Sequence, residues 1–274
     1  AAITITLPDA AGPTTAEETH AAGGAWWPLA AFRELDDALC HLRLEYLEVG
    51  TITLHTRGDP AVIRALDGLL ESGQDHWFVN EVRHLIKRVL KRLDLTARSL
   101  FAIADENSCF VGTLLELALA ADRVYLLNDP DMPVHMGVTP MNGGPYPMSN
   151  GLTRLQTRFL GEPERVDEVL GEADLFDAER ADELGLATSA PDSIDWEDEL
   201  RLAVEERASF SPDALTGMEA NLRFAGPETM ETKIFARLSA WQNWIFQRPN
   251  AVGERGALKC YGTPNRPEFN YDRT

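Results

Sequence analysis

Glu116 is a carboxylate among apolar neighbours. It lies in the stretch SCFVGTLLELALAADR, residues 108–123, where small residues lead into a run of Leu and Ala. An apolar pocket raises the pKa of a carboxyl group and makes it a general acid or base near neutral pH. The alternative is a buried glutamate that only hydrogen-bonds a neighbouring loop. The spacing of residues alone leaves both interpretations open.

Two backbone amides near Glu116 could form an oxyanion hole. We expect a helix to begin at Gly112 and Thr113, and the first N–H groups of a helix have no partner inside it. Such donors stabilise a developing oxyanion. A second donor is expected near Gly58, in the stretch HTRGD, where glycine lets a ligand approach the backbone. If the two preceding strands are parallel neighbours, both donors lie at the edge where open α/β sheets bind ligands.

Cys109 and Asn142 are the other candidate catalytic residues. A lone cysteine in an apolar stretch is more often a small buried hydrophobe than a site residue. Asn142 lies in the loop MNGGPYPMSNG and could orient a water, with loop capping as the alternative. A Ser or Cys hydrolase is disfavoured, because the sequence has no GxSxG motif and nothing pairs Cys109 with a histidine.

The expected positions of these candidate residues depend on an alternation of strands and helices along the chain. Periodicity predicts strands in ITITLP, GTITLHTRGDP, RSLFAIAD and RVYLL, and helices in PLAAFRELDDALCHLRLEYLE and WFVNEVRHLIKRVLKRLDL. The second helix carries an apolar stripe that runs from Phe78 to Leu93. This order predicts an α/β fold with a largely parallel sheet.

The character of the chain changes after about residue 150, where helical patterns broken by Gly and Pro follow one another. We therefore predict an α/β core over residues 1–190 and a helical C-terminal region over 191–274. The last long helix has more apolar residues than one solvent-facing helix needs, and its stripe predicts docking to a core or to a second subunit. The stripe consists of Phe235, Leu238, Trp241, Trp244 and Ile245.

The composition limits the classes of function. The formal net charge of −19 over 274 residues disfavours nucleic-acid binding, because such a chain repels a phosphate backbone. Three cysteines without CxxC spacing, Cys40, Cys109 and Cys260, favour reduced thiols in a cytoplasm over a disulfide frame or a zinc site. No apolar run reaches the length of a membrane span, and the N-terminus does not resemble a signal peptide. We expect a cytoplasmic protein without metal.

The stretch GTLLELALAAD resembles the fingerprint of the crotonase (enoyl-CoA hydratase/isomerase) superfamily, in which a strand, a Gly-rich loop and a helix read GGG-x-ELALACD. MNGGPYPMSNGLTRL and LFDAERADELGLA resemble the loop and helix that follow it. The resemblance implies an α/β fold of the ClpP/crotonase type, a spiral of ββα units with a helical C-terminal region. It places the two peptide N–H groups that hold a thioester enolate on Gly58 and Thr113. The second catalytic glutamate of the hydratases would fall near 139–141, where no carboxylate stands.

A closer resemblance is to the family of benzoyl-CoA-dihydrodiol lyases, in its C-terminal half. It rests on SCFVGTLLELALAADR, YPMSNGLTRL and SAWQNWIFQRPNAVGERGALKCYG. Members of that family are similar to two crotonase-like halves in tandem, and they hydrolytically open a dearomatised benzoyl-CoA ring with release of formate. The resemblance implies an acyl-CoA substrate, with coenzyme A as part of it and no other cofactor. It also implies a partner, either further copies in a dimer or trimer or an upstream crotonase-like half.

Two hypotheses follow for this chain. In the first it is a lyase or hydrolase of an aryl-CoA thioester, with Glu116, Cys109, Asn142 and the Gly58/Thr113 amides as its site. In the second it is a non-catalytic crotonase-like half that supports a catalytic partner domain and mediates dimerisation.

Overall fold

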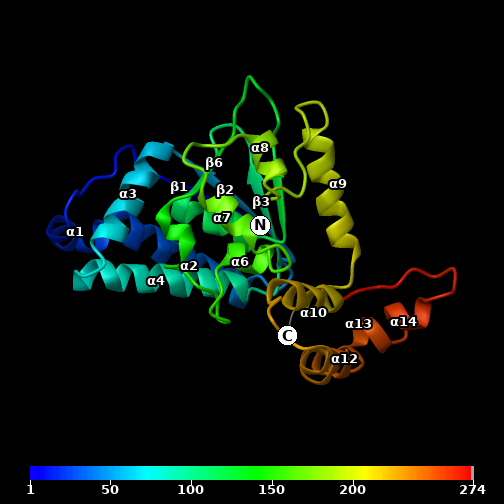
Figure 1. Ribbon diagram of the computed structural model, residues 1–274. Helices are drawn as coiled ribbons and strands as arrows, with labels where there is room; N and C mark the ends of the chain where they lie inside the picture. Colours follow the sequence, from blue (N-terminus) through cyan, green and yellow to red (C-terminus); the bar gives the residue numbers. More distant parts are fainter. Residues whose placement is uncertain (273–274) are drawn as a thin grey trace.

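Two parallel sheets form the centre of the protein, and the computed structural model describes residues 1–272 (Figure 1). The main sheet has the strand order β1-β2-β3-β5, and the second sheet pairs β4 with β6. All pairings within the two sheets are parallel, which confirms the predicted sheet type. The strands are β1 Ala2–Thr6, β2 Thr51–Arg57, β3 Ser99–Ala104, β4 Cys109–Val111, β5 Arg123–Leu126 and β6 His135–Gly137.

The burial of the strands follows their position in the sheet. β3 lies between β2 and β5, and all six of its residues are buried. β2 alternates between buried and half-buried residues. A central parallel strand covered on both faces needs a continuous apolar run, and SLFAIA supplies it.

The helices that precede residue 190 pack around the sheets. α2 and α4 pack against each other, and α4 buries a stripe from Val79 to Leu93. The stripe shows the predicted helical period, although Val79 rather than Phe78 is its first buried residue. The helices before residue 190 are α1 Ala16–Ala22, α2 Trp27–Glu45, α3 Pro60–Ser72, α4 Trp77–Asp94, α5 Leu115–Ala120, α6 Arg154–Arg158, α7 Glu164–Leu170 and α8 Ala178–Glu183.

The predicted α-helical start at Gly112 is wrong. Gly112–Leu114 form a 3₁₀ turn, and α5 begins at Leu115 and has only six residues. Gly112 has a φ of +55°, outside the helical region, so the chain turns there before the α-helix can start. Because α5 begins at Leu115, Glu116 lies in its first turn rather than one turn inside the helix.

The chain after residue 190 is helical. The elements are α9 Trp196–Ser209, α10 Pro212–Arg223, α11 Met230–Thr232, a π-helical segment Lys233–Leu238, α12 Ser239–Ile245, α13 Pro249–Val252 and α14 Ala257–Cys260. In Figure 1, α9 stands beside the strands, whereas α12 to α14 extend away from them. The domain boundary at residue 190 stays a prediction.

The apolar stripe of the last long helix is only partly covered. Trp241 lies on Gly217 of α10, where an added Cβ would be 3.4 Å from the indole ring. Phe235 is 80% exposed and Leu238 is 49% exposed.

Between residues 1 and 272, no helix combines the length and the hydropathy that crossing a bilayer requires.

Candidate functional site

Gly58 follows β2 and is in close contact with Leu7. Its φ is +137°, and an added Cβ would be 2.5 Å from the Leu7 Cβ. The Leu7 N–H donates to the carbonyl of Arg57 at 2.8 Å, which holds Leu7 against the end of β2. The close approach that was expected of a ligand is therefore made by a side chain of the protein itself.

The Thr113 amide has a carboxylate as its partner. It donates to Asp67 Oδ2 at 2.8 Å, and the Thr113 hydroxyl donates to Asp67 Oδ1 at 2.5 Å. Asp67 comes from α3 and is 1% exposed. Thr139 Oγ1 donates to Asp67 Oδ2 at 2.7 Å as a third bond. Asp67 thus occupies the position in which the predicted oxyanion would accept the Thr113 N–H.

Gly112 makes room for this carboxylate. A Cβ built on Gly112 would lie 1.9 Å from Asp67 Oδ2, and the positive φ at this position already favours glycine. Burial is the largest effect on Asp67 and raises its pKa to about 6, although the bonds from Thr113 and Thr139 act in the opposite direction. Asp67 was not predicted as a site residue, yet a signal was present, since it stands beside Leu66 and Leu70 on the apolar face of α3.

Glu116 is buried within an ion-pair network. It is 2% exposed, and its Oε2 accepts a hydrogen bond from Arg154 Nη1 at 2.8 Å. Arg154 also forks onto Asp94, with Nε to Oδ1 at 3.0 Å and Nη2 to Oδ2 at 2.7 Å. Burial raises the pKa of Glu116, while the Arg154 charge and the bond from Asn142 lower it. One guanidinium therefore compensates two buried carboxylates.

Asn142 connects Glu116 to the turn before α5. Its Nδ2 donates to Glu116 Oε1 at 2.8 Å and to the carbonyl of Gly112 at 2.9 Å. Its Oδ1 accepts from the Thr139 N–H at 3.0 Å, which closes the 3₁₀ turn Pro140–Gly143. Asn142 and Glu116 are thus in direct contact, and both predicted residues belong to one cluster. Asn142 also performs the loop capping that was its alternative interpretation.

Cys109 lies in β4, apart from that cluster. It is fully buried, and burial raises the pKa of its thiol to about 12. Its amide donates to Thr56 Oγ1 at 3.0 Å. A thiol with this pKa remains protonated near neutral pH, so the environment favours a small buried hydrophobe over a nucleophile. All three cysteines are free thiols.

The carboxylates near Glu116 are not arranged as a metal site. Over the described residues 1–272, no group of three or more His, Cys, Asp or Glu side chains could together hold a metal ion. The polar groups of the cluster instead satisfy one another. The sequence analysis missed Arg154 and Asp94, which determine the charge balance at Glu116.

Comparison with known proteins supports the fold and the resemblance stated from the motifs. No family model matches the chain. A benzoyl-CoA-dihydrodiol lyase of Aromatoleum evansii is 49% identical over 272 residues, which cover 99% of this chain and 49% of the lyase. The chain therefore spans about half the length of the curated relative that it matches.

Solved structures show the same fold at low sequence identity. An enoyl-CoA hydratase of Bacillus anthracis has a TM-score of 0.65 and 17% identity, covering 88% of each chain. An enoyl-CoA hydratase/isomerase of Marinobacter aquaeolei has a TM-score of 0.64 and 18% identity, covering 99% of this chain and 95% of its own. The predicted crotonase-like α/β fold is thus confirmed.

Proposed function

Because the chain has the crotonase fold and is related to half of a benzoyl-CoA-dihydrodiol lyase, we propose that it is one half of such a lyase. The reaction is the hydrolytic opening of a dearomatised benzoyl-CoA ring with release of formate, on a substrate that carries coenzyme A as a thioester. The observation that carries this proposal is 49% identity along 99% of the chain. We further propose that the enzyme acts in the cytoplasm and needs no metal at the Glu116 cluster.

A chimaera tests the proposal. The 272 matched residues of the Aromatoleum evansii lyase are replaced by this chain, and formate release from the dihydrodiol of benzoyl-CoA is measured. We expect turnover within about tenfold of the parent, because a half that shares fold and function presents the same surfaces to its partner. A folded chimaera without turnover contradicts the proposal. A chimaera that carries an unrelated crotonase-fold chain is the control and is expected to be inactive.

We propose that the Glu116 cluster supports the fold of this half and does not carry the chemistry. Three contacts argue for this division of labour. Arg154 neutralises Glu116, Asp67 accepts the Thr113 amide, and Leu7 fills the space at Gly58. A general base needs a free lone pair within reach of the substrate proton that it removes, and an oxyanion hole needs free N–H donors. In this arrangement other residues of the chain occupy the Glu116 carboxylate and the Thr113 amide, and Leu7 packs against Gly58.

The first hypothesis, catalysis by Glu116 with Gly58 and Thr113 as the oxyanion hole, requires two displacements. Asp67 has to release the Thr113 amide and Arg154 has to release Glu116. Calorimetric titration of the 274-residue chain with benzoyl-CoA distinguishes the hypotheses. We expect that benzoyl-CoA shows no saturable binding that depends on Gly58, so that Gly58→Pro leaves the titration unchanged. One site per chain that is lost in Gly58→Pro, with the fold intact, would support catalysis at this cluster.

We propose that the exposed stripe of the last long helix contacts the other half of the lyase. Phe235 and Leu238 are exposed apolar side chains, and the relative has a second half of similar length. With the other half of the Aromatoleum evansii lyase expressed as a separate chain, we expect co-purification that Phe235→Asp weakens. If Phe235→Asp instead dissociates a dimer or trimer of this chain alone, the stripe is a contact between copies.

A further inference from the structure

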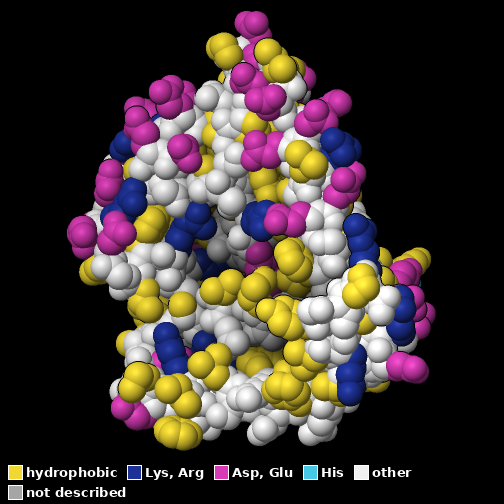
Figure 2. All heavy atoms as spheres, turned by 90° about the vertical axis from the view of Figure 1, so that its right-hand side faces the viewer, with side chains coloured by type: hydrophobic (Ala, Val, Ile, Leu, Met, Phe, Trp, Pro, Cys, Tyr) yellow, Lys and Arg dark blue, Asp and Glu magenta, His cyan; other side chains and the backbone are white. Residues whose placement is uncertain are grey.

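A cavity of about 460 Å³ lies between the sheet and α10, and neither Glu116 nor Thr113 is among its lining residues. Its walls come from the beginning of β3 and β5, the end of α5, α6 and the region from Arg207 to Ala225. The beginnings of β3 and β5 mark the amino edge of the parallel sheet, so the cavity is at the opposite edge from Gly58. The face that carries α9 and α10 is hollowed in Figure 2, with basic and acidic side chains inside and hydrophobic ones along the lower border.

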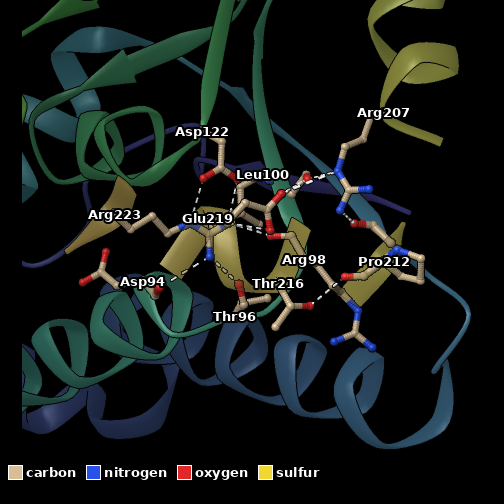
Figure 3. Close-up of polar contacts among 12 residues, drawn as sticks. Asp94, Thr96, Arg98, Leu100, Asp122, Arg207, Pro212, Thr216, Glu219 and Arg223 are labelled. Atoms are coloured by element: carbon tan, nitrogen blue, oxygen red, sulfur yellow. Dashed lines mark hydrogen bonds and ion pairs between the residues drawn. The ribbon is translucent and has the colours of Figure 1, made fainter. Parts of the chain in front are cut away.

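Hydrogen bonds and ion pairs fix the position of α10 relative to the sheet. Arg223 donates to Asp122 through Nε and Nη2, at 2.8 and 2.6 Å, and to the carbonyl of Arg98 at 2.6 Å (Figure 3). Glu219, one turn earlier, bonds the hydroxyl of Ser99. These contacts place α10 firmly across the start of β3. The cavity is therefore built into the fold and is not a gap between loosely attached segments.

Five arginines and three carboxylates line the cavity, and most of these charges are paired. Three carboxylates line it, and each has an arginine partner: Asp94 pairs with Arg154, Asp122 with Arg223, and Glu219 with Arg207. Two further arginines also line it: Arg123 lies 3.6 Å from Glu206, whereas Arg158 has no ion pair among residues 1–272. Since Arg154 is shared by Asp94 and Glu116, Arg158 is the one lining arginine, within residues 1–272, without a carboxylate partner.

Arg158 can still donate hydrogen bonds to a ligand. Its Nε donates to the carbonyl of Gly185 at 2.7 Å, and burial lowers its pKa. Within residues 1–272, no carboxylate lies within 4 Å of its nitrogens as an ion-pair partner. The Gly185 bond fixes the plane of the guanidinium and leaves the two terminal nitrogens, which present parallel donors to a carboxylate. Burying a cation without an anion costs free energy, and a bound anion would remove that cost.

The rest of the cavity is apolar. Phe101, Leu119 and Met148 form the inner wall, and Leu215 is buried against it. At the mouth, Phe210 is 47% exposed, Met218 is 50% exposed and Leu222 is 68% exposed. An apolar body held by Arg158 at one end would cover these exposed side chains. Cavities of this volume that combine apolar walls with a few oriented polar groups are typical of small-molecule sites.

We propose that this cavity binds a small amphipathic carboxylate, with Arg158 on the carboxylate and the apolar wall on an acyl or aryl body. A fork of two N–H donors suits a carboxylate, and the volume admits a chain of several carbons or an aromatic ring. The proposal goes beyond the lyase function, because neither Glu116 nor Thr113 lines the cavity, although Asp94 and Arg154 of the Glu116 network form part of its wall.

Calorimetric titration of the whole chain with octanoate tests the proposal. We expect one site per chain, and at least tenfold weaker binding of octanol, which has the body without the charge, and of inorganic phosphate, which has charge without the body. Arg158→Leu should weaken octanoate binding at least tenfold. The matched control is Arg165→Leu, since Arg165 also donates to a backbone carbonyl but lies outside the cavity, and it should leave binding unchanged.

A second variant guards against misfolding of Arg158→Leu. Leu222→Glu adds a negative charge at the exposed mouth and should weaken octanoate binding several-fold without affecting the fold. Octanoate binding that survives both substitutions overturns the proposal, as does equal binding of octanol. Absence of octanoate and benzoate binding to the folded chain also overturns it.

Discussion

Replacing Arg154 by Met removes the cation that two buried carboxylates share. The Arg154 side chain is 1% exposed, and those of Asp94 and Glu116 are each 3% exposed. Three charge-assisted hydrogen bonds, at 3.0, 2.7 and 2.8 Å, are lost together. Breaking a buried ion pair by removing one partner costs about 3–5 kcal/mol, because the remaining charge is left without compensation. We expect a loss of unfolding free energy in that range at pH 7.

The pH dependence separates this mechanism from a simple packing defect. Arg154 lowers the pKa of Asp94 and Glu116, so its removal raises both pKa values further in the folded state. A carboxyl group with a raised folded pKa stabilises the fold when protonated, and that contribution is lost as the pH rises through its folded pKa. The deficit of Arg154→Met should therefore shrink as the pH is lowered from 8 to 5. Adding Glu116→Gln to Arg154→Met should recover about 1–3 kcal/mol at pH 7.

Urea unfolding at several pH values measures both effects. Arg201→Met is the matched control, because Arg201 also contacts two carboxylates, Asp198 and Glu205, but all three side chains are more than half exposed. We expect no measurable change in the control. The reasoning is refuted if Arg154→Met is no more destabilising than Arg201→Met, or if its deficit is independent of pH.

Three further predictions concern Asp67 and Cys109. Gly112→Ala should destabilise the fold more than Gly12→Ala in urea unfolding, because both have positive φ but only the Gly112 Cβ meets Asp67 Oδ2; equal losses would contradict this. Asp67 should titrate near pH 6 by carboxyl NMR, and the unfolding free energy it contributes should rise by up to about 3 kcal/mol as the pH falls from 7 to 4. A value near 4 would be contrary to the structure. Cys109 should resist alkylation at pH 8 until the protein is unfolded, whereas the half-buried Cys40 should react first, as peptide mass spectrometry can show.

The sequence predicted most of the framework, because strong periodicity and burial agree there. SLFAIA and the α4 stripe were identified from apolar pattern alone, and both are fully integrated in the core. Among the helices that were missed, two begin with a recognisable N-cap and a proline at the first position: Asp59 with Pro60 in α3, and Ser211 with Pro212 in α10. The short strands β4 and β6 have three residues each, too few for a period to be recognised.

The candidate site was only partly predictable. The spacing of ELALA brought Glu116 into the first turn of a buried helix, and Asn142 was rightly placed near it. The partners of the site residues come from distant parts of the chain. Arg154 is 38 residues from Glu116, and Asp67 is 46 residues from Thr113. A local pattern contains no information about such pairings. A charged residue on an apolar face, such as Asp67 or Asp94, was the only available sign.

Formate release by the chimaera with Glu116→Gln is the most direct test of the proposed division of labour. Gln keeps the shape of the side chain and can still bond Asn142, but it cannot act as a general base. We predict turnover within a few-fold of the unmodified chimaera. A loss of a hundredfold or more, in a variant whose unfolding shows an intact fold, would contradict the account and make Glu116 a catalytic residue.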